Sequence, residues 1–343
     1  MTGESVLIIA EAGVNHNGDL AKARDLIQVA AESGADIVKF QTFRAEKLVS
    51  KSARKADYQI RNLESQETSQ LSMLRKLEMP EDWHHELMAL AAELKIGFLS
   101  TGFDEESVDF LDRLGMPLFK VPSGEMTNKR YLQHIARKGK PIILSTGMAD
   151  ESEVGRAIEV LIAEGIRREN LTILHCNTEY PTPMKDVNLH AMNALGRRFD
   201  VRVGYSDHTL GIEVPVAAVA LGAKVIEKHF TLDRSLPGPD HKASLEPVEL
   251  GEMVRAIRNI ELAISGSGTK TPSESERKNI AVARKSIHLA SDVAKGTRIQ
   301  ESHLVMKRPG DGISPMDIDA VIGRVLNRDL AVDDKLLWEH LES

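Results

Sequence analysis

Two histidines, His208 and His229, each end a strand-like run of the sequence. The interval between them contains an apolar helical segment near residues 216–221 and has room for one loop and one crossover helix. Neighbouring parallel strands joined in this way bring both imidazoles to the same edge of a sheet. Polar residues surround the pair: Ser206, Asp207, Glu227, Lys228 and Asp240. A single histidine at a strand end is more simply interpreted as a hydrogen-bonding cap, but two in polar surroundings predict a metal site.

Short β-rich runs alternate with amphipathic helical stretches along most of the chain. Eight strands are predicted, at residues 6–11, 37–42, 97–101, 118–123, 141–146, 171–176, 201–206 and 225–230. Between them, apolar residues recur at the spacing of a helical turn, as at Leu87, Leu90, Ala91 and Leu94. Strands this apolar are typical of a parallel sheet covered on both faces. Eight strand–helix units within about 265 residues predict an α/β protein with a closed (β/α)8 TIM barrel rather than an open sheet.

Polar residues gather where the predicted strands end, which is where TIM barrels carry their chemistry. In chain order they are Glu11 with Asn15-His16-Asn17, Lys39, Gln41, Ser100-Thr101, Lys120, Ser123, Ser145-Thr146, residues 177–180, Ser206-Asp207-His208 and His229. One or two such residues would be explained as caps of the following helices. Eight strand ends in succession predict an active site.

The composition narrows the class of protein. The chain has 343 residues, of which 42% are hydrophobic, and a net charge of −7 with both signs interspersed. We therefore expect a globular cytoplasmic protein with no nucleic-acid partner and no membrane partner. Cys176 is the only cysteine, which excludes a disulfide framework and a thiolate-rich metal cluster. A small buried residue is the simpler interpretation of Cys176, and a nucleophile the alternative.

The barrel pattern stops near Ile264, and a stretch of small residues with Gly and Pro follows. We predict a catalytic barrel at residues 1–265, a linker at 266–282 and a small domain at 283–343. The last domain carries short strands and turns, and so small a unit has a thin core that often leans on a partner surface. Lys307 and Arg308 stand there beside a Pro-Gly turn.

Eight segments of the chain, taken in order, resemble the motifs of bacterial sialic acid synthases. They are residues 9–18, 38–42, 120–125, 145–148, 175–183, 205–209, 227–231 and 237–241, including Tyr205-Ser206-Asp207-His208-Thr209 and Glu227-Lys228-His229-Phe230-Thr231. The C-terminal segment is similar to the antifreeze-like (SAF, β-clip) domain of those enzymes. The resemblance covers the whole chain and implies membership of the nonulosonic acid synthases.

The resemblance implies condensation of phosphoenolpyruvate with the open-chain aldehyde of an unphosphorylated N-acetylated hexosamine, with release of phosphate. The first expectation is N-acetylmannosamine, which gives N-acetylneuraminate. The alternative is 2,4-diacetamido-2,4,6-trideoxymannose, which gives N,N′-diacetyllegionaminate. A non-catalytic carbohydrate-binding barrel is a remote alternative, because it would be expected to have lost a lysine or a metal histidine.

The same resemblance implies roles for individual residues. Glu11, Lys39 and Lys120 are the expected catalytic residues, with Glu11 as general base or only as a substrate ligand. Expected phosphoenolpyruvate ligands are Lys39, Thr101, Lys120, Ser123, Ser145, Asn177, Thr178 and Ser206. Expected sugar ligands are Glu11, Gln41, Tyr180, Asp240 and Arg308. His208 and His229 would bind a divalent cation, with Mn²⁺ the first choice and Mg²⁺, Co²⁺ or Zn²⁺ as alternatives, and His241 is the weaker competitor.

Two parts of the family pattern concern individual roles: the Asn177-Thr178 pair and Arg308. Many members have Thr-Asn where this chain has Asn177-Thr178, so either residue is a candidate for the contact with phosphoenolpyruvate. Arg308 corresponds to an arginine that reaches the sugar in the neighbouring subunit's active site. The resemblance therefore implies a domain-swapped homodimer.

Overall fold

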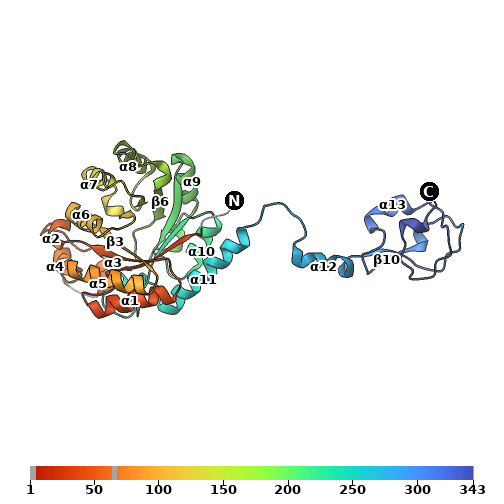
Figure 1. Cartoon of the computed structure of the whole chain (residues 1–343), viewed down its shortest axis with the longest axis horizontal. Coiled ribbons are helices and arrows are strands. Elements are labelled where there is room, and N and C mark those ends of the chain that lie inside the picture. The colour runs from red at the N-terminus through yellow and green to blue at the C-terminus, as the bar shows by residue number, and fades with distance from the viewer. Residues whose placement is uncertain (1–4, 64–67, 343) are drawn as a thin grey trace. The chain divides into compact units, whose positions relative to one another are not determined.

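The computed structural model describes residues 5–63 and 68–342, and the chain forms two compact units at residues 1–266 and 267–343. The first unit contains the eight predicted strands, each bounded within two residues of its expected position (Figure 1). They are β1 (Leu7–Gly13), β2 (Ile37–Thr42), β3 (Gly97–Gly102), β4 (Phe119–Val121), β5 (Ile142–Ser145), β6 (Leu171–Cys176), β7 (Arg202–Asp207) and β8 (Val225–His229).

All eight strands belong to one parallel sheet. Its order is β3-β2-β1-β8-β7-β6-β5-β4, and the end strands β3 and β4 come into contact, so the sheet curves into a nearly closed barrel. Neighbouring strands in register place Glu11 beside both Lys39 and His229. The predicted TIM barrel is confirmed.

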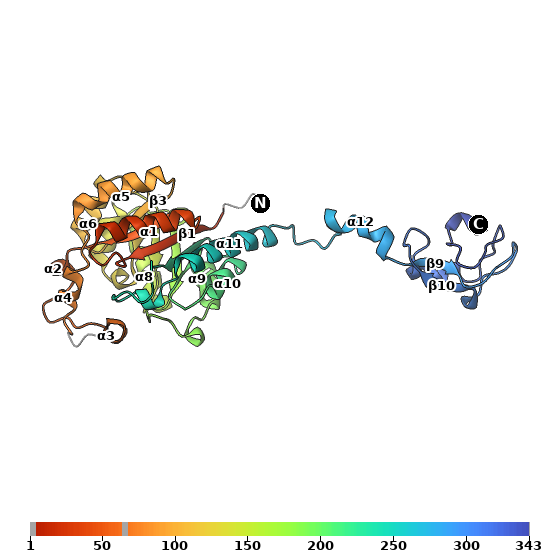
Figure 2. The ribbon, with the colours of Figure 1, turned by 90° about the horizontal axis from the view of Figure 1, so that it is seen from below.

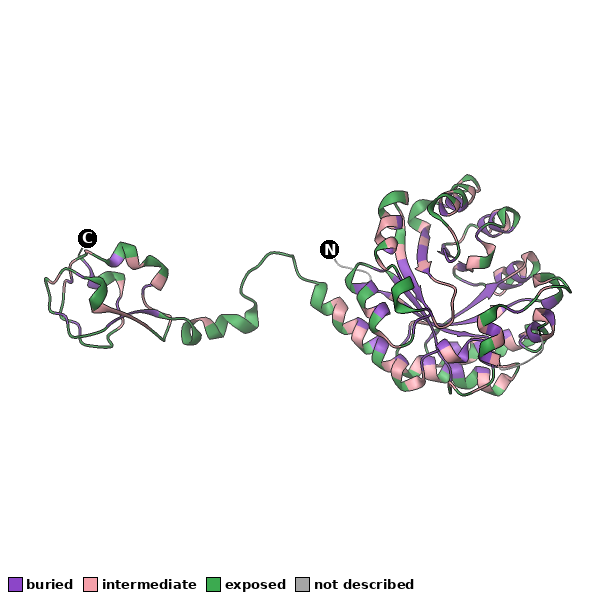
Figure 3. Cartoon of the chain, turned by 180° about the vertical axis from the view of Figure 1, so that it is seen from behind, coloured by how far each residue is buried: buried purple, intermediate pink, exposed green. Residues whose placement is uncertain are grey.

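Helices surround the barrel and turn apolar faces towards it (Figure 3). They are α1 (Leu20–Glu32), α5 (Glu81–Glu93), α6 (Glu105–Arg113), α7 (Lys129–Ala136), α8 (Glu151–Ala163), α9 (His190–Phe199), α10 (Glu213–Ala220) and α11 (Pro247–Ile264). Aspartates fix several starting points: the side chains of Asp19 and Asp104 accept backbone N–H groups, and Asp150 forms a capping box with Glu153.

Side chains alternate between the two faces of each strand, and this alternation divides the interior into layers. In β2, Val38 and Phe40 pack into the core shared with the helices, whereas Lys39 and Gln41 point into the barrel. Ile9, Ile143, Leu174 and Val225 form a separate apolar cluster inside the barrel. The charged side chains of the site therefore stand on a hydrophobic layer.

Residues 43–80 interrupt the alternation between β2 and β3, and we call them the β2–β3 excursion. They contain three short helices, α2 (Ala45–Leu48), α3 (Asp57–Leu63) and α4 (Gln70–Arg75), which gather to one side of the barrel (Figure 2). A small apolar cluster, including Phe43, Leu71 and Leu74, holds the excursion together. None of these helices is predicted from the sequence.

The second unit begins with α12 (Glu274–Ala283), which occupies much of the predicted linker. Its capping box of Ser273 and Glu276 explains why a helix starts there, although all but one of its residues are exposed. The rest comprises β9 (Ser286–Leu289), antiparallel to β10 (Leu304–Lys307), and α13 (Ile318–Val321). A separate core that includes Ile287, Leu326 and Leu336 supports this unit.

Short 3₁₀ turns complete the described elements. They are η1 (Ser123–Glu125), η2 (Arg168–Asn170), η3 (Met184–Asp186), η4 (His241–Ala243), η5 (Glu301–His303), η6 (Pro315–Asp317) and η7 (Trp338–His340). In the part of the chain that the structure describes, no helix is long and apolar enough to cross a lipid bilayer.

Candidate active site

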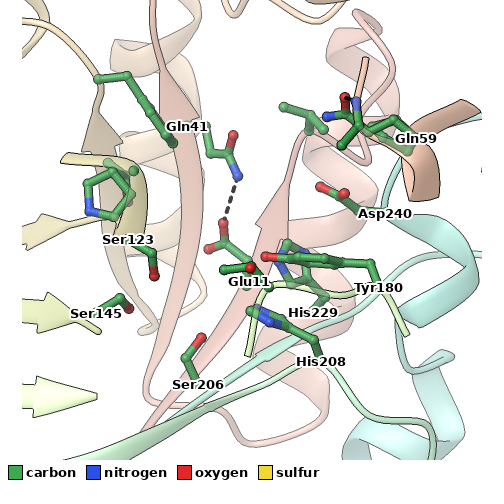
Figure 4. A pocket seen from close by; sticks show the side chains of 18 of the residues that line it. Glu11, Gln41, Gln59, Ser123, Ser145, Tyr180, Ser206, His208, His229 and Asp240 are labelled. Carbon is green, nitrogen blue, oxygen red and sulfur yellow. Dashed lines mark hydrogen bonds between the residues drawn. The ribbon is translucent and has the colours of Figure 1, made fainter. Parts of the chain in front are cut away.

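A pocket of about 610 Å³ opens at the C-terminal ends of the barrel strands. Every strand contributes to its lining: Glu11, Lys39, Gln41, Thr101, Lys120, Ser145, Cys176, Ser206, Glu227 and His229. Figure 4 shows many of these side chains pointing towards one another. The strand-end residues singled out in the sequence therefore converge on one space.

Four buried charged residues, Glu11, Lys39, Lys120 and Glu227, form what we call the pocket floor. Lys39 Nζ lies 2.7 Å from Glu11 Oε2 and 3.5 Å from Glu227 Oε2. Lys120 Nζ lies 3.3 Å from Glu227 Oε1. Glu227 therefore holds both ammonium groups in the barrel, and the floor presents two cations to the pocket above.

Burial and neighbouring charges shift the pKa values of the floor residues in different directions. Burial lowers the pKa of Lys120. It would also lower that of Lys39, but the carboxylates of Glu11 and Glu227 outweigh it and raise the pKa. For Glu227, the opposing effect of Lys120 and Lys39 outweighs burial and lowers the pKa to about 2. Burial raises the pKa of Glu11, which brings this carboxyl group closer to the range useful for proton transfer.

Hydroxyl groups surround the floor. Thr101 Oγ1 accepts a hydrogen bond from Lys39 Nζ at 3.0 Å, and Ser206 Oγ donates to Glu227 Oε1 at 3.0 Å. Ser123 Oγ accepts the backbone N–H of Gly147 at 3.0 Å. Among the described residues, the buried Ser145 Oγ has no hydrogen-bond partner. Cations and hydroxyls in this arrangement are suited to an anion that carries phosphate and carboxylate groups.

Asn177 and Thr178 face different ways. Thr178 lines the pocket, and its methyl group would clash with any side chain at Gly147. Asn177 Oδ1 instead accepts the backbone N–H of Glu179 at 2.8 Å, within its own loop. The sequence left both residues as candidates, and the geometry favours Thr178 as the one whose side chain faces the pocket.

His208 and His229 lie side by side, with ring centroids 5.5 Å apart. Tyr180 stacks on His208 at 4.0 Å between centroids and meets the edge of His229 at 5.6 Å. His208 donates its Nδ1–H to the carbonyl of Asn177, which leaves Nε2 with a lone pair. Within the described residues, Nδ1 of His229 is buried without a hydrogen-bond partner. The two imidazoles share one corner of the pocket, as expected from their positions in the sequence.

The two imidazoles have the chemistry of cation ligands. Burial lowers the pKa of His208 to about 4 and that of His229 well below its usual value, so both rings are neutral near pH 7. A neutral ring keeps the lone pair that a metal needs. In residues 5–63 and 68–342, no group of three or more His, Cys, Asp or Glu side chains is arranged to hold a metal ion. The side chains present therefore fit a cation that takes only two ligands from the described residues.

The excursion supplies a second side of the pocket, which we call the pocket wall. Its lining residues are Leu48, Val49, Ala56, Asp57, Tyr58, Gln59, Gln70, Met73, Leu74 and Leu77. The ring of Tyr58 stacks on Tyr180 at 4.9 Å between centroids. Asn62 donates to the carbonyl of Pro239 at 2.7 Å and so ties the wall to the loop of Asp240.

Asp240 is buried beside Tyr180 and Gln59 in the view of Figure 4. Burial and the charge of Glu11 raise its pKa to about 7. Across the pocket, Gln41 Nε2 donates to Glu11 Oε1 at 3.2 Å. Gln41, Tyr180 and Asp240, the residues expected to meet the sugar, thus lie around the same space as the histidines.

Two expected residues lie elsewhere. His241 binds Thr231 Oγ1 at 2.7 Å and Asn17 Oδ1 at 3.2 Å through its two ring nitrogens, so it fastens a loop and does not face the pocket. Arg308 is exposed in the second unit, directly after β10.

The sequence indicates Glu227 as one of the polar residues around the two histidines, but its role in the floor was not predicted, and neither was the wall. The role of Glu227 could have been predicted, because it lies two residues before His229 in β8 and side chains two positions apart share one face of a strand. The roles of Tyr58 and Gln59 could not, since these residues lie in a short helix without apolar periodicity.

Comparisons with known proteins agree with this arrangement. Residues 26–270 match the NeuB family, and residues 284–342 match the SAF domain. The chain is 52% identical to the N,N′-diacetyllegionaminic acid synthase of Campylobacter jejuni, over 96% of this chain and 98% of that protein. It is 51% identical to the enzyme of the same name from Legionella pneumophila, over 98% and 94%. The crystal structure of the N-acetylneuraminic acid synthetase of Leptospira borgpetersenii matches with a TM-score of 0.70 and 32% identity, over 81% of this chain and 90% of that one.

The barrel, its C-terminal domain and these relatives define an enzyme class: the phosphoenolpyruvate-utilising transferases that make nonulosonic acids. The chain belongs to the NeuB family, and its C-terminal segment is a SAF domain. The family resemblance of the sequence motifs is confirmed.

Proposed function

We propose that this enzyme condenses phosphoenolpyruvate with 2,4-diacetamido-2,4,6-trideoxymannose to give N,N′-diacetyllegionaminate and inorganic phosphate. The observation that carries the choice of sugar is the identity of 52% and 51% with two proteins named as N,N′-diacetyllegionaminic acid synthases, against 32% with an N-acetylneuraminic acid synthetase. This replaces N-acetylmannosamine, the first expectation from the sequence.

The pocket wall supports this choice. Leu48, Val49, Met73, Leu74 and Leu77 give much of it an apolar lining, beside the polar side chains of Asp57, Gln59 and Gln70. The proposed substrate has a methyl group at C6 and a second acetamido group at C4, whereas N-acetylmannosamine has hydroxyls at both positions. Apolar side chains gain free energy by burying methyl groups and offer no partner to a hydroxyl.

Phosphoenolpyruvate would bind at the pocket floor. Lys39 and Lys120 supply positive charge, and Thr101, Ser123, Ser145, Thr178 and Ser206 supply hydroxyls. Lysines serve as point charges for phosphate and carboxylate groups. The sugar aldehyde would lie between this anion and the corner formed by Tyr180, His208 and His229, with Gln41 and Asp240 bound to its hydroxyl or amide groups.

His208 and His229 would hold a divalent cation, with Mn²⁺ the first choice, and the cation would supply Lewis-acid polarisation of the aldehyde oxygen. C3 of phosphoenolpyruvate attacks the aldehyde carbon, the aldehyde oxygen gains a proton, and C2 becomes electron-deficient. Water adds to C2 and gives up a proton, for which Glu11, with its raised pKa, is the acceptor. The C–O bond to phosphate then breaks while the new C2 hydroxyl gives its proton to the departing phosphate, which leaves the 2-keto acid and inorganic phosphate.

Phosphate release tests the sugar and the metal together. We expect kcat/KM with the diacetamido sugar to exceed that with N-acetylmannosamine by about 100-fold, the scale on which an apolar pocket rejects an added hydroxyl. We also expect chelation with EDTA to abolish turnover and added Mn²⁺ to restore it. Equal or better use of N-acetylmannosamine would contradict the proposed substrate, and full activity after exhaustive chelation would contradict the metal.

We further propose that Arg308 reaches the sugar site of a second subunit in a homodimer. This rests on the resemblance, and the loops after β5, β6 and β7 support it, because Met148, Met184 and Leu210 expose apolar side chains there. Such residues around the pocket mouth suit contact with another protein surface.

Subunit complementation tests this arrangement. Arg308→Ala should raise the KM for the sugar about 10- to 100-fold and leave that for phosphoenolpyruvate unchanged, since one charge-assisted hydrogen bond is worth about 1.5–3 kcal/mol. Co-expression with Lys120→Met should restore activity, because each mixed dimer then has one intact barrel facing an intact Arg308. An unchanged KM for the sugar, or no recovery in the mixed dimers, would contradict the proposal.

A further inference from the structure

A fully buried ion pair lies behind the two histidines. Lys228 Nζ contacts Asp207 Oδ2 at 2.5 Å, and neither side chain is accessible to solvent. Asp207 immediately precedes His208 and Lys228 immediately precedes His229. The two charged residues are also direct partners in the register of β7 and β8.

The pair points away from the pocket. Ser206, His208, Glu227 and His229 line the pocket, and side chains alternate along a strand, so the residues between them face the opposite side of the sheet. Asp207 and Lys228 therefore cannot touch a substrate in the pocket. They can act on the chemistry only indirectly, through the backbone that carries the histidines or through the field of their charges at the two rings.

The pair ties the turn that carries His208. Asp207 Oδ1 accepts the backbone N–H of Thr209 at 3.1 Å, and Asp207 Oδ2 accepts the Thr209 hydroxyl at 2.9 Å. Lys228 Nζ donates to the carbonyl of Thr209 at 2.5 Å. The backbone N–H, the hydroxyl hydrogen and the carbonyl of Thr209 are thus all bound by Asp207 or Lys228. The backbone of His208 is therefore held on both sides.

Stability alone does not explain such a pair. Taking two charges out of water offsets most of their attraction, and apolar residues of similar volume often replace a buried ion pair without loss of stability. The alternative benefit is a unique local geometry. The histidines need such a geometry, because among the described residues the His208 ring is hydrogen-bonded through Nδ1 to the carbonyl of Asn177 and His229 Nδ1 has no hydrogen-bond partner.

We propose that Asp207, Lys228 and Thr209 form a positioning knot that sets the spacing of His208 and His229 for a divalent cation. The inference rests on the proposed function, in which these histidines hold that cation. Lys228 fixes the end of β8 to the turn after β7, so the separation of the two imidazoles depends on the knot. None of the three residues is a catalytic residue.

The test measures Mn²⁺ binding directly. Chelator-stripped protein is titrated with Mn²⁺, and free Mn²⁺ is followed by its electron paramagnetic resonance signal. The double variant Asp207→Asn/Lys228→Met removes both charges but keeps an acceptor for the N–H of Thr209. We expect its Kd for Mn²⁺ to rise at least tenfold, while its thermal midpoint stays close to that of the wild type.

An ion pair at the other end of the barrel provides the matched control. Arg258 Nη2 binds Asp36 at 2.8 and 2.7 Å, and Asp36 also accepts the N–H of Ile8 at the start of β1. The variant Asp36→Asn/Arg258→Met should lower the thermal midpoint and leave the Kd for Mn²⁺ within twofold. An equal loss of Mn²⁺ affinity in this control would overturn the proposal, because it would show that general loosening of the barrel suffices.

The outcomes separate this inference from the function on which it rests. If neither the wild type nor any variant binds Mn²⁺, the proposed cation site fails. If the wild type binds, His208→Ala does not, and the double variant binds as tightly as the wild type, the knot is not a positioning device. Should the double variant fail to fold, Thr209→Val decides: it removes one hydroxyl contact, should weaken Mn²⁺ binding about threefold, and overturns the proposal if the Kd is unchanged.

Discussion

The floor and the wall of the pocket are built in different ways. The floor residues stand on strands, are buried, and pair with one another at 2.7–3.5 Å. The wall residues come from the short helices and turns of the β2–β3 excursion, which contacts the barrel loops through the stacked ring of Tyr58 and the hydrogen bond of Asn62. A rigid charged floor suits the phosphoenolpyruvate step that is common to the enzyme class. A wall built by the β2–β3 excursion can change with the sugar and leave that step intact.

The largest expected effect is the loss of one floor cation. Lys120→Met removes one of the two floor lysines available to phosphoenolpyruvate and, among the described residues, leaves Glu227 with Lys39 as its one lysine partner. Removing one partner of a buried charge contact with a ligand costs about 2–5 kcal/mol of binding free energy, so we expect kcat/KM for phosphoenolpyruvate to fall by up to about 1000-fold. Steady-state phosphate release at varied phosphoenolpyruvate measures it.

Lys140→Met is the matched control for that variant. Lys140 lies 2.6 Å from Asp112 and is not a lining residue of the pocket. Its replacement should leave kcat/KM within about twofold, the usual range for partly exposed ion pairs. If Lys120→Met kept most of the activity, the floor would not be the anion site, and the comparison between floor and wall would fail.

The next effect concerns Asp240, which lies where floor and wall meet. Burial and Glu11 raise its pKa from 3.8 to about 7 in the folded protein. The folded state therefore binds this proton more tightly than the unfolded state, so the stability contributed by the protonated group is complete below pH 3.8 and is lost as the pH rises through 7.

Asp240→Asn removes this titration. The stability of the variant relative to the wild type should rise between pH 5 and pH 8, by about 4 kcal/mol at most over the full shift. Thermal midpoints at four pH values measure the difference. A constant difference across the range would show that Asp240 is not held protonated by its surroundings.

The contrast between floor and wall also explains how much the sequence predicts. Strands such as β2 and β6 lie at their predicted positions because alternating or continuous apolar residues define them. Lys39 and Lys120 follow directly, since a strand position fixes the face of its side chain. Glu227 could have been placed by the same rule.

The wall could not be predicted in that way. Its position depends on contacts between distant segments, such as Asn62 with Pro239 and Tyr58 with Tyr180. Its helices have four to seven residues, too few for a helical periodicity to stand out. The sequence motifs therefore predicted the reaction class, whereas the proposed sugar rests on the identity with named relatives.

The smallest expected effect separates the wall from the floor most clearly, because the substitution should alter the wall alone. Tyr58→Leu removes the ring that stacks on Tyr180, which in turn stacks on His208. An aromatic pair is worth about 0.5–1.5 kcal/mol, so the KM for the sugar should rise about three- to tenfold. The KM for phosphoenolpyruvate should stay constant, since within residues 5–63 and 68–342 the hydrogen bond and ring contact of Tyr58 are with Gln59 and Tyr180 and not with the floor.

Tyr58→Phe separates the ring from its hydroxyl. It keeps the stack on Tyr180 and should therefore leave the KM for the sugar within about twofold of the wild type. If Tyr58→Leu raised both Michaelis constants equally, the wall would be part of the anion site as well. If Tyr58→Phe had the larger effect, the hydroxyl rather than the stacked ring would be the feature of the wall that recognises the sugar.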